Sequence, residues 1–426
     1  MLIEFSIGNF KSIKDIETLS MNASNLQSKY PHLEINNLFS KRDDLKLLKS
    51  KAIYGANASG KSNLFKALEA FKVIISRSVS SEKVLSWKIA PFKLNKKSSE
   101  SPTFFQIQFL KEDTIYRYGF VSDKEKIHSE WLFKKVDRET PLFTREGSDF
   151  DFNKAQFSEG SIMKGILKES EDNKTSPTYL FLTFIAKVLK GTISTELVNF
   201  ITKKIVLVSG LDTEKNTKNA EEYIENKENR EILVNLVKAA DMGINDVNYF
   251  DFNEGKKDKN IKNEKDIYVY AIKQSYDDNN ELSGYEIMGM NKEESKGTQK
   301  MFELAPYIIN CLNEGGILFI DEFDSKFHSL LTKKIVELFN SNTNNKGQLI
   351  FITHDTNLLS SKLLRRDQIS FANKDKYGSS HFYSLAEFKG VRSLTSYEND
   401  YMHGKFGAIP SLGDFEDIFI EDGQEN

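Results

Sequence analysis

One segment, residues 54–69, constrains the fold of this chain more than any other. It contains Gly55, four further residues and then Gly60, Lys61 and Ser62, directly after a short apolar stretch. The two glycines let backbone N–H groups curl around a β-phosphate, and a helix that starts at Gly60 directs its positive end to the same place. The segment therefore predicts a nucleotide-binding strand, loop and helix within an α/β fold.

The polar residues of this loop have expected contacts with a bound nucleotide. Lys61 would reach the β- and γ-phosphates, and the Ser62 hydroxyl would ligate Mg²⁺. The expected cofactors are therefore ATP and Mg²⁺. The residues of the loop that we expect to bind the nucleotide are Gly55, Asn57, Ser59, Gly60, Lys61, Ser62 and Asn63.

Short apolar runs alternate with helical segments in the last third of the chain, as is typical of buried parallel strands. These runs are ILFI (317–320), LIFIT (349–353) and QISFA (368–372). The first run ends in Asp321 and Glu322. Next to a phosphate loop, Asp321 is expected to hold Mg²⁺, directly or through water. Glu322 is expected to orient and deprotonate the attacking water.

The second of these runs ends in Thr353, His354 and Asp355. A single histidine at the end of a strand is more often structural than catalytic. Parallel neighbours end at the same edge of a sheet, however, so His354 is expected near the Asp-Glu pair, where it can sense the γ-phosphate. Cys311 and the other histidines show no metal-ligand spacing, so no zinc site is predicted, and Cys311 is assigned to the core.

A further polar stretch, ESKGTQKMF (294–302), precedes an apolar helix. Helical spacing is followed by the apolar residues Met301, Leu304, Ala305, Ile308, Ile309 and Leu312. Ser295, Gly297 and Gln299 occupy the start of this helix, where free N–H groups and the dipole favour an anion. The simpler interpretation of the same residues is an ordinary N-cap.

Composition limits the other classes of function. The 426 residues include 59 basic and 62 acidic side chains, a net charge of −3 that argues against a protein coated uniformly by DNA. A single cysteine excludes a disulfide framework and indicates a reducing compartment. Glu4 interrupts the N-terminal apolar residues, and the longest apolar stretch, 179–186, is too short to cross a bilayer. We therefore expect a cytoplasmic protein with no membrane contact.

The order of the patterns predicts three parts. Residues 1–150 form an N-terminal ATPase lobe with the phosphate loop and an antiparallel sheet, whose strands are expected at 104–110, 114–121 and 126–135. Residues 151–250 form a helical insertion. Residues 251–426 form a C-terminal ATPase lobe with the remaining motifs, after a charged loop at 253–266 that is expected to be a solvated linker.

The phosphate loop, the S-x-G-T-Q stretch, the I-D-E strand and the T-H-D strand end occur in the order and spacing of the ABC-type ATPases of the SMC and RecF group. The chain more closely resembles the AbiLi/RloA-like AAA-family ATPases of bacterial abortive-infection and restriction-associated operons. This resemblance covers nearly the whole chain and rests on FSIGNFKSI, YGANASGKSNLFKAL, PFKL, RYGF, SEWLFKK, KAADMGI, SKGTQKMFELAP, IDEFDSKFH, ITHDTNLL, RRDQISFANKD and YMHGKFGAIP.

The resemblance implies an ABC-type head: a phosphate-loop α/β core, an antiparallel β-subdomain and a helical insertion in place of a long coiled-coil arm. It also implies a dimer that encloses two ATP molecules, with Ser295, Gly297 and Gln299 of one copy contacting the γ-phosphate held by the other. Further residues implied by the family are Asp324 and Ser325 in a dimer-sensing loop, and Lys11, beside Asn9, near the phosphates. Lys296 departs from the small residue that is usual in the signature, and neither Gln106 nor Gln108 suits the glutamine loop.

The predicted function is that of an ATP-hydrolysing regulator in anti-phage defence. It would act as a homodimer or higher homo-oligomer on an operon-encoded effector, a nuclease or a toxin. The alternative is an ATPase of the RecF/SMC type that senses DNA ends or junctions in repair. Near-neutral charge and the lack of a long arm favour the first, whereas a strongly basic groove would favour the second; contact with nucleic acid stays open. A guanine-binding motif is not predicted, because residues 373–376 read NKDK and end in lysine.

Overall fold

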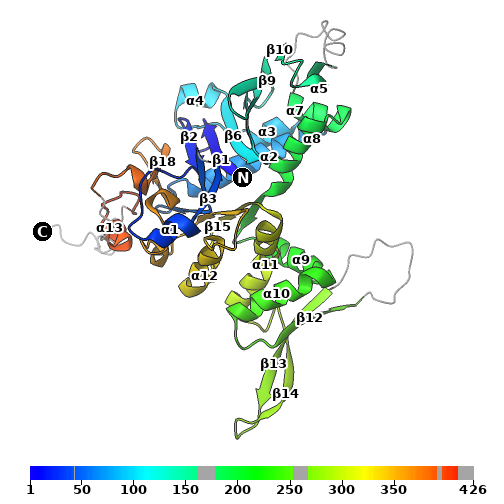
Figure 1. The fold of residues 1–426 in the computed structure, drawn as a ribbon, viewed down its shortest axis with the longest axis vertical. Helices are drawn as coiled ribbons and strands as arrows, with labels where there is room; N and C mark the ends of the chain where they lie inside the picture. Colours follow the sequence, from blue (N-terminus) through cyan, green and yellow to red (C-terminus); the bar gives the residue numbers. More distant parts are fainter. Residues whose placement is uncertain (43, 162–177, 253–266, 391–395, 411–426) are drawn as a thin grey trace, which may run out of the picture.

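A computed structural model gives the fold of the chain (Figure 1). It describes all residues except 43, 162–177, 253–266, 391–395 and 411–426. The charged segment 253–266, expected to be a linker, lies outside the described residues.

A six-stranded sheet forms the centre of the molecule, in the order β11-β15-β16-β5-β17-β18. The first five strands are parallel, and only β18 runs antiparallel to its neighbour. The strands are β5 (Ser50–Tyr54), β11 (Ile205–Ser209), β15 (Gly316–Asp321), β16 (Gly347–Ile352), β17 (Ile369–Lys374) and β18 (Ser380–Ser384). The predicted α/β class is confirmed.

Helices cover both faces of this sheet, which explains the continuous apolar runs of its strands. On β15, Ile317 and Phe319 belong to the core that contains helix α2 (Lys61–Arg77). Leu318 and Ile320 alternate with them and join the core under α11 (Lys296–Glu314) and α12 (Ser329–Phe339). The phosphate-loop helix and α11 therefore lie on opposite faces of the same sheet.

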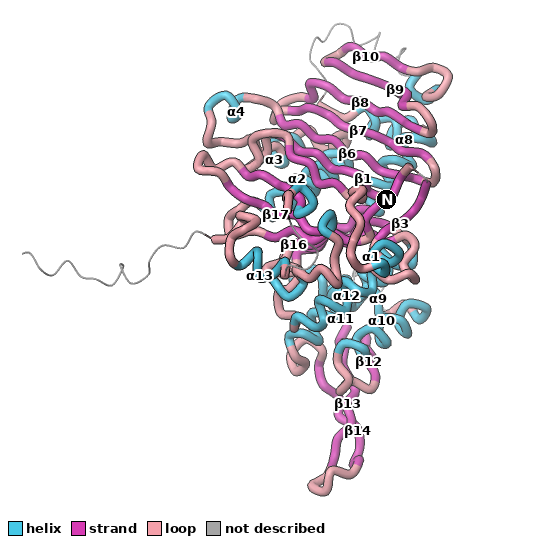
Figure 2. The backbone as a smooth tube through the Cα atoms, turned by 60° about the vertical axis from the view of Figure 1, so that its left-hand side comes forward, coloured by secondary structure: helices cyan, strands magenta, loops and turns pink. Residues whose placement is uncertain are grey.

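A seven-stranded antiparallel sheet packs on the other side of α2, in the order β10-β9-β8-β7-β6-β1-β2 (Figure 2). Its strands are β1 (Leu2–Gly8), β2 (Glu17–Ser20), β6 (Thr103–Lys111), β7 (Thr114–Ser122), β8 (Ile127–Lys135), β9 (Glu139–Glu146) and β10 (Asp149–Phe152). Phe71 of α2 contacts Phe5 and Phe120, with ring centroids 5.6 Å apart in each pair. These aromatic contacts fix α2, and with it the phosphate loop, between the two sheets.

The first group of helices within residues 151–250 packs on the antiparallel sheet. It contains α5 (Ser158–Ser161), α7 (Phe181–Phe184), η1 (Ile185–Leu189), α8 (Thr192–Asn199) and η2 (Phe200–Lys204). The carboxylate of Glu130 on β8 accepts hydrogen bonds from the backbone N–H of Phe181 and Leu182, at 2.7 and 3.0 Å. Glu130 and its partner Arg145 are both fully buried. A buried carboxylate thus holds the start of α7.

The predicted helical insertion, residues 151–250, contains a strand of the central sheet. Residues 205–209, IVLVS, form β11, which pairs in parallel with β15 and so belongs to the central sheet. The run is rich in β-branched residues and short, and its neighbour β15 supplies the hydrogen bonds that a strand needs. The helices on either side consequently pack on different parts of the molecule. The three-part division of the chain stays a prediction.

The second group of helices within residues 151–250, which follows β11, packs against α11 and is followed by a projecting sheet (Figures 1 and 2). Helices α9 (Thr213–Ile224) and α10 (Lys227–Ala240) share a core with α11. The three-stranded antiparallel sheet contains β12 (Asp246–Asp251), β13 (Ile267–Tyr276) and β14 (Leu282–Gly289), with β13 in the middle. Beyond Ile272, only β13 and β14 continue, as a two-stranded ribbon.

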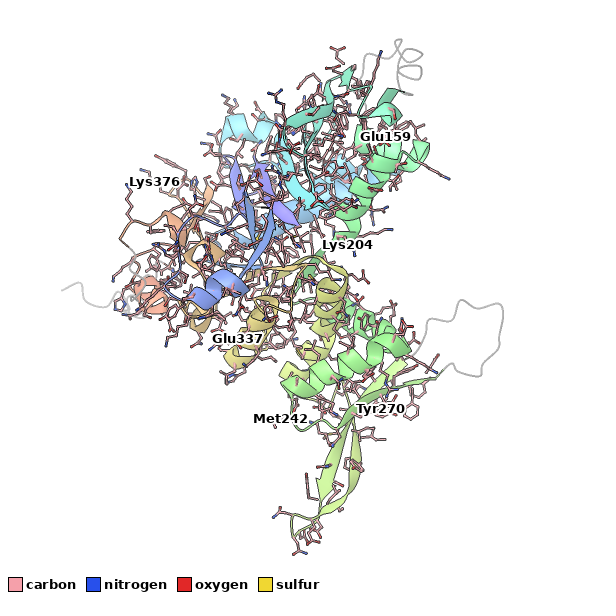
Figure 3. The ribbon with its side chains drawn as sticks, viewed as in Figure 1. Glu159, Lys204, Met242, Tyr270, Glu337 and Lys376 are labelled. Atoms are coloured by element: carbon pink, nitrogen blue, oxygen red, sulfur yellow. The ribbon has the colours of Figure 1, made fainter. Side chains whose placement is uncertain are left out.

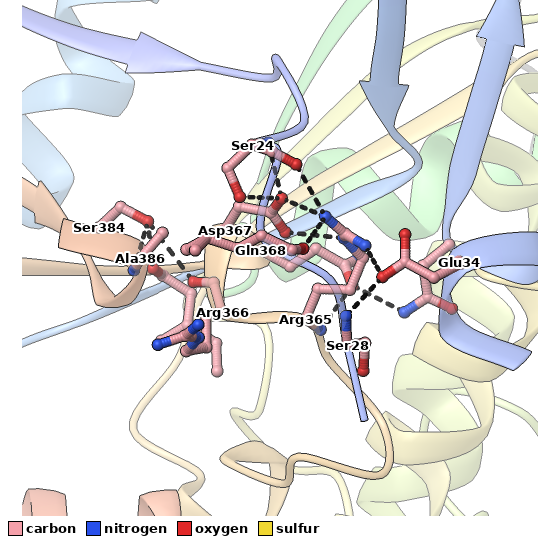
Figure 4. Close-up of polar contacts among 12 residues, drawn as sticks. Ser24, Ser28, Glu34, Arg365, Arg366, Asp367, Gln368, Ser384 and Ala386 are labelled. Atoms are coloured by element: carbon pink, nitrogen blue, oxygen red, sulfur yellow. Dashed lines mark hydrogen bonds and ion pairs between the residues drawn. The ribbon is translucent and has the colours of Figure 1, made fainter. Parts of the chain in front are cut away.

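Further helices and strands lie around the two large sheets. They are α1 (Pro31–Asn36), β3 (Leu38–Arg42), β4 (Leu45–Leu48), α3 (Val84–Lys88), α4 (Lys96–Glu100) and α13 (Tyr397–Met402). Arg365, just before β17, binds the carboxylates of Asp367 and Glu34 (Figure 4). Asp367 also accepts hydrogen bonds from the N–H and hydroxyl of Ser24, at 2.8 and 2.9 Å. This buried network attaches the segment around residues 24–34 to the start of β17.

Candidate nucleotide-binding site

The phosphate loop joins β5 to α2 at the carboxyl edge of the central sheet. Gly60 has a φ of +105° and Ala58 a φ of +62°, so the loop turns through left-handed conformations before the helix begins. A Cβ atom on Gly60 would collide with the hydroxyl oxygens of Ser12 and Ser380. Glycine is therefore required here both by backbone conformation and by space.

Lys61 is folded back onto this loop. Its Nζ donates to the carbonyl oxygens of Gly55 at 2.7 Å and Ala56 at 2.9 Å. Burial lowers the pKa of Lys61, and the acidic groups of Glu322, Asp321 and Asp324 act against that shift. The ammonium group thus lies beside the phosphate loop. It is also close enough to Asp321 and Glu322, which we call the acidic strand end, for their charges to affect its pKa.

Two serines from distant parts of the chain form hydrogen bonds with the phosphate loop and the helix that follows it. Ser380 on β18 donates its hydroxyl to the carbonyl of Ser59 at 2.7 Å, and its oxygen lies 2.7 Å from that of Ser12. The side-chain amide of Asn63 donates to Ser12 Oγ at 2.7 Å. Sequence reasoning gave no role to Ser12, which lies within FSIGNFKSI, or to Ser380, because only the folded chain brings them to the loop.

Asp321 and Glu322 follow β15 at the same edge. Asp321 is buried and hydrogen-bonded to the Ser62 hydroxyl; burial raises its pKa, while this bond and the charges of Lys66 and Lys61 act to lower it. Glu322 is half-buried and adopts a left-handed φ of +55°. The two residues that the sequence predicted on either side of the Mg²⁺ position, Ser62 and Asp321, are in direct contact.

Gly210, which directly follows β11, forms backbone contacts with the acidic strand end of β15. Its N–H donates to the carbonyl of Asp321 at 2.7 Å, and its own carbonyl accepts from Lys300 Nζ and, at 3.3 Å, from the Ser325 hydroxyl. A Cβ atom on Gly210 would collide with the backbone oxygen of Glu322. Gly210 and Lys300 are further residues that the sequence analysis missed. The signal for Gly210 was the apolar run before it.

His354 follows β16, which is the parallel neighbour of β15, as predicted. Its backbone N–H donates to Asp324 Oδ1 at 3.1 Å. Partial removal from water and repulsion by Lys61 lower the pKa of the His354 imidazole, against the attraction of Asp324, Glu322 and Asp321. The structure therefore brings the phosphate-loop lysine, the acidic pair and this histidine together in one site.

The predicted signature residues lie at the start of α11, on the other face of the sheet from α2. Ser295 is the N-cap, and its Oγ accepts from the Thr298 N–H at 3.1 Å, so the simpler interpretation is confirmed. Gln299 donates to the Glu294 carbonyl at 2.9 Å, and Lys296 and Gln299 line a groove of about 710 Å³ beside α9. Ser295 and Lys296 are exposed and Gly297 is half-buried. Contact with a phosphate held by another subunit stays a prediction.

Lys11 lies at the edge of the predicted site. Its side chain is exposed, and the charged groups that act on its pKa are Lys66, Glu69 and Lys88. Removal from water is the largest of the effects that lower this pKa. The neighbouring Asn9 is structural: it donates to the Ser98 carbonyl at 2.8 Å and accepts from the Phe92 N–H at 3.0 Å. A role for Lys11 at the phosphates also stays a prediction.

The sequence matches one protein-family model over residues 52–360. That family is described as "AAA domain, putative AbiEii toxin, Type IV TA system". The chain belongs to this family. The matched region runs from β5 through the phosphate loop and the acidic strand end to the segment after His354, so the family assignment covers the site itself.

Solved structures of SMC heads resemble this family member along most of its length. The SMC head domain from Thermotoga maritima shares 13% identity, covers 90% of this chain and 98% of its own, and gives a TM-score of 0.41. An SMC head bound to the C-terminal winged-helix domain of ScpA shares 13% identity over 90% of this chain and 97% of its own, with a TM-score of 0.44. No curated protein matches the sequence.

Membership of a P-loop ATPase family implies ATP binding, and the residues present fit a nucleotide. Ser59 Oγ is buried and has no hydrogen-bond partner among the described residues, which leaves a donor for a phosphate oxygen. Within the same residues, no group of three or more His, Cys, Asp or Glu side chains could hold a metal ion. Ser62 and Asp321 supply oxygen ligands, and a site of this kind takes the remaining ligands from phosphate and water.

In the part of the chain that the structure describes, no helix is long and apolar enough to cross a membrane.

Proposed function

We propose that this chain is an ABC-type ATPase that encloses ATP between two copies and uses the resulting closure to regulate a partner effector in anti-phage defence. One observation carries the proposal. Lys61, Asp321, Glu322 and His354 gather at the carboxyl edge of the central sheet, whereas the exposed start of α11, on the face opposite α2, presents a second set of anion-binding groups. Each chain then supplies two different halves of a shared site.

The first half provides the chemistry in cis. Lys61 exchanges its contacts with the loop carbonyls for phosphate oxygens, and Ser59 donates to a further one. Mg²⁺, when bound at Ser62 and Asp321, would neutralise charge on the β- and γ-phosphates. Glu322 orients the attacking water and accepts its proton, and His354, kept neutral by its lowered pKa, donates a hydrogen bond to the γ-phosphate.

The second half acts in trans. The backbone N–H groups at the start of α11 and the side chains of Ser295 and Gln299 supply donors, and the helix dipole adds positive potential. Exposure of Ser295 and Lys296 supports this role, because groups that meet another subunit's ligand must be at the surface. Asp324 and Ser325 lie beside both halves and are assigned to sensing closure.

Membership of a family described as a putative toxin of a type IV toxin–antitoxin system supports a role in defence with an operon-encoded effector, a nuclease or a toxin. A DNA-end or junction sensor of the RecF/SMC type is the alternative, and the balanced charge of 59 basic and 62 acidic residues weighs against it. Linear DNA that strongly stimulates ATP hydrolysis would favour the alternative.

The first prediction tests the site directly. Wild-type protein should bind and hydrolyse ATP with Mg²⁺, and Lys61→Ala should weaken ATP binding by a factor of about 10–100, because a charge-assisted hydrogen bond contributes about 1.5–3 kcal/mol. Isothermal titration calorimetry and phosphate release measure both effects. Lys93→Ala, at an exposed position outside the site, is the matched control. Equal ATP affinity of the Lys61→Ala variant and wild type would rule out the assigned phosphate loop.

A further inference from the structure

The projecting sheet exposes an apolar surface that ATP chemistry does not require. Register places Phe250, Tyr268, Tyr276, Leu282, Tyr285 and Ile287 on one face of β12, β13 and β14. We call these six residues the aromatic face. Their side chains are 37% to 60% exposed although every one is aromatic or aliphatic. Exposed apolar side chains that gather on one side of a sheet mark an interaction surface.

The opposite face of the same sheet has a different character. Near the base it holds Val247, Val269 and Ala271, which are buried against α9, α10 and α11. Nearer the tip it carries Lys273 opposite Glu286. The alternation therefore directs the charged pair to one side and the aromatic face to the other. At the base, Asp246 lies on the same side as the aromatic face, opposite Ile272, and its carboxylate lies 3.6 Å from Arg230.

The ribbon also lacks the support that a sheet of this shape needs. Among the described residues, only two strands continue beyond Ile272, and an isolated two-stranded ribbon is marginally stable in water. At the base, Tyr270, labelled in Figure 3, stacks on Phe250 with ring centroids 5.0 Å apart. Figures 1 and 2 show the ribbon extending away from the rest of the molecule. Its apolar side is thus free to receive a second layer.

We infer that the aromatic face packs against the aromatic face of a second copy of this chain, in an antiparallel arrangement that needs no nucleotide. Sheets packed face to face lie about 10 Å apart and interdigitate their side chains. The six half-exposed residues offer on the order of 500 Å² per copy, so two copies bury on the order of 1,000 Å², the lower limit of a specific interface.

The acidic residues at the tip of the ribbon favour the antiparallel orientation of the two copies. Asp277, Asp278 and Glu281 form the turn between β13 and β14. Ten residues of strand span roughly 30 Å, so antiparallel packing separates the two acidic tips by several times the Debye length of about 8 Å. Parallel packing would place the tips together. The same acidic tip repels nucleic acid, the other partner for which exposed aromatic side chains are suited.

Sedimentation velocity of the full chain without nucleotide tests the association. Wild-type protein should dimerise, and a variant with Tyr285→Ser and Ile287→Ser should associate at least about tenfold more weakly, since each buried aromatic or aliphatic anchor contributes above about 1 kcal/mol. A variant with Ser275→Ala and Glu286→Gln, on the opposite face, is the matched control and should behave as wild type. A monomeric wild type at all concentrations, or equal association of the two variants, would overturn the inference.

Cross-linking tests the arrangement independently of any loss of stability. Cys311 is buried and its pKa is raised to about 12, so it does not react with maleimides in the folded protein. A short bismaleimide should join two copies of Ile287→Cys, which lies near the middle of the aromatic face, and should not cross-link Glu286→Cys, although that variant still associates. Equal cross-linking at both positions would contradict the face-to-face arrangement. Because no nucleotide is present, failure here is distinct from failure of the ATP-dependent dimer.

Discussion

At the scale of single residues, the environment of His354 decides how the site responds to pH. The pKa of its imidazole is lowered by removal from water and by Lys61, so the ring is neutral at physiological pH. A neutral ring can donate one hydrogen bond without adding charge beside Lys61. The acidic groups that oppose this shift are Asp324, Glu322 and Asp321, to which we assign roles in catalysis and closure.

The second prediction follows from this shift. Below the ordinary histidine pKa of about 6.5, the unfolded chain binds a proton that the folded chain excludes, so stability rises with pH through the window between the lowered folded pKa and about 6.5. Removing the imidazole removes this penalty. The Tm of His354→Gln should therefore fall less than that of wild type between about pH 7.5 and about pH 5.5. Calorimetry at several pH values measures the Tm, with His403→Gln as the control. An equal fall in Tm for His354→Gln and His403→Gln would contradict the lowered pKa assigned to His354.

At the scale of elements, β11 connects the acidic strand end to the start of α11. Gly210 accepts from Lys300 and Ser325 and donates to Asp321. Lys300 lies on α11, one turn after the signature residues, whereas Ser325 lies in the proposed dimer-sensing loop. Gly210 thus connects the end of β15, to which we assign the chain's own ATP, with α11, whose start we propose to contact the ATP of another subunit.

The third prediction concerns Gly210 itself. Substitution by alanine places a Cβ atom against the backbone of Glu322, so the catalytic carboxylate must shift. Gly210→Ala should lower kcat by a factor of about 10–100, because a small misplacement of a catalytic group costs about this much. The affinity for ATP should remain, since the phosphate loop is not touched. Single-turnover hydrolysis and calorimetry separate these effects; loss of both together would contradict a purely positional role.

The fourth prediction concerns the buried pair on α11. Lys300 Nζ lies 3.9 Å from Glu303 Oε2, and both side chains are almost fully buried. Lys300→Met leaves an uncompensated carboxylate and should lower the free energy of unfolding by about 3 kcal/mol. Adding Glu303→Leu should recover most of this loss. Urea unfolding of wild type, Lys300→Met and the double variant measures these differences in the free energy of unfolding.

The pair Lys334 and Glu337 on α12 has the same spacing at the surface. Lys334→Met with Glu337→Leu is the matched control, and it should change the urea midpoint much less because water screens the exposed charges. A cost at the surface pair equal to that at the buried pair would show that burial does not set the energy of the interaction.

How far the sequence predicts this fold depends on the range of the contacts involved. The phosphate loop, the Asp321 strand and the His354 strand were predictable, because each motif lies at the end of an apolar run and parallel strands end at one edge. β11 was missed, because its five residues lie among helical patterns and only its pairing with β15 reveals it. Ser12 and Ser380 were missed for the same reason: they act through contacts between distant parts of the chain.

At the scale of the whole molecule, the projecting sheet is linked to the start of α11. Lys273 on β13 binds Glu294 at 2.8 Å, just before the N-cap Ser295. Asp241, after α10, lies 4.0 Å from the same ammonium group and accepts from the Thr298 hydroxyl at 2.8 Å. The proposed partner on the projecting sheet and the proposed phosphate at the start of α11 would therefore act on one network of charges. The two proposed interfaces lie on different parts of the chain and can operate together.

The fifth prediction tests the central claim, that two chains jointly enclose ATP. Glu322→Gln removes the base that activates water and keeps the groups that bind phosphate. Light scattering of this variant, with the aromatic face disrupted by Tyr285→Ser and Ile287→Ser, isolates the nucleotide-dependent contact. The account predicts a monomer without nucleotide and a dimer at saturating ATP and Mg²⁺. A mass that stays monomeric when ATP is fully bound would contradict it.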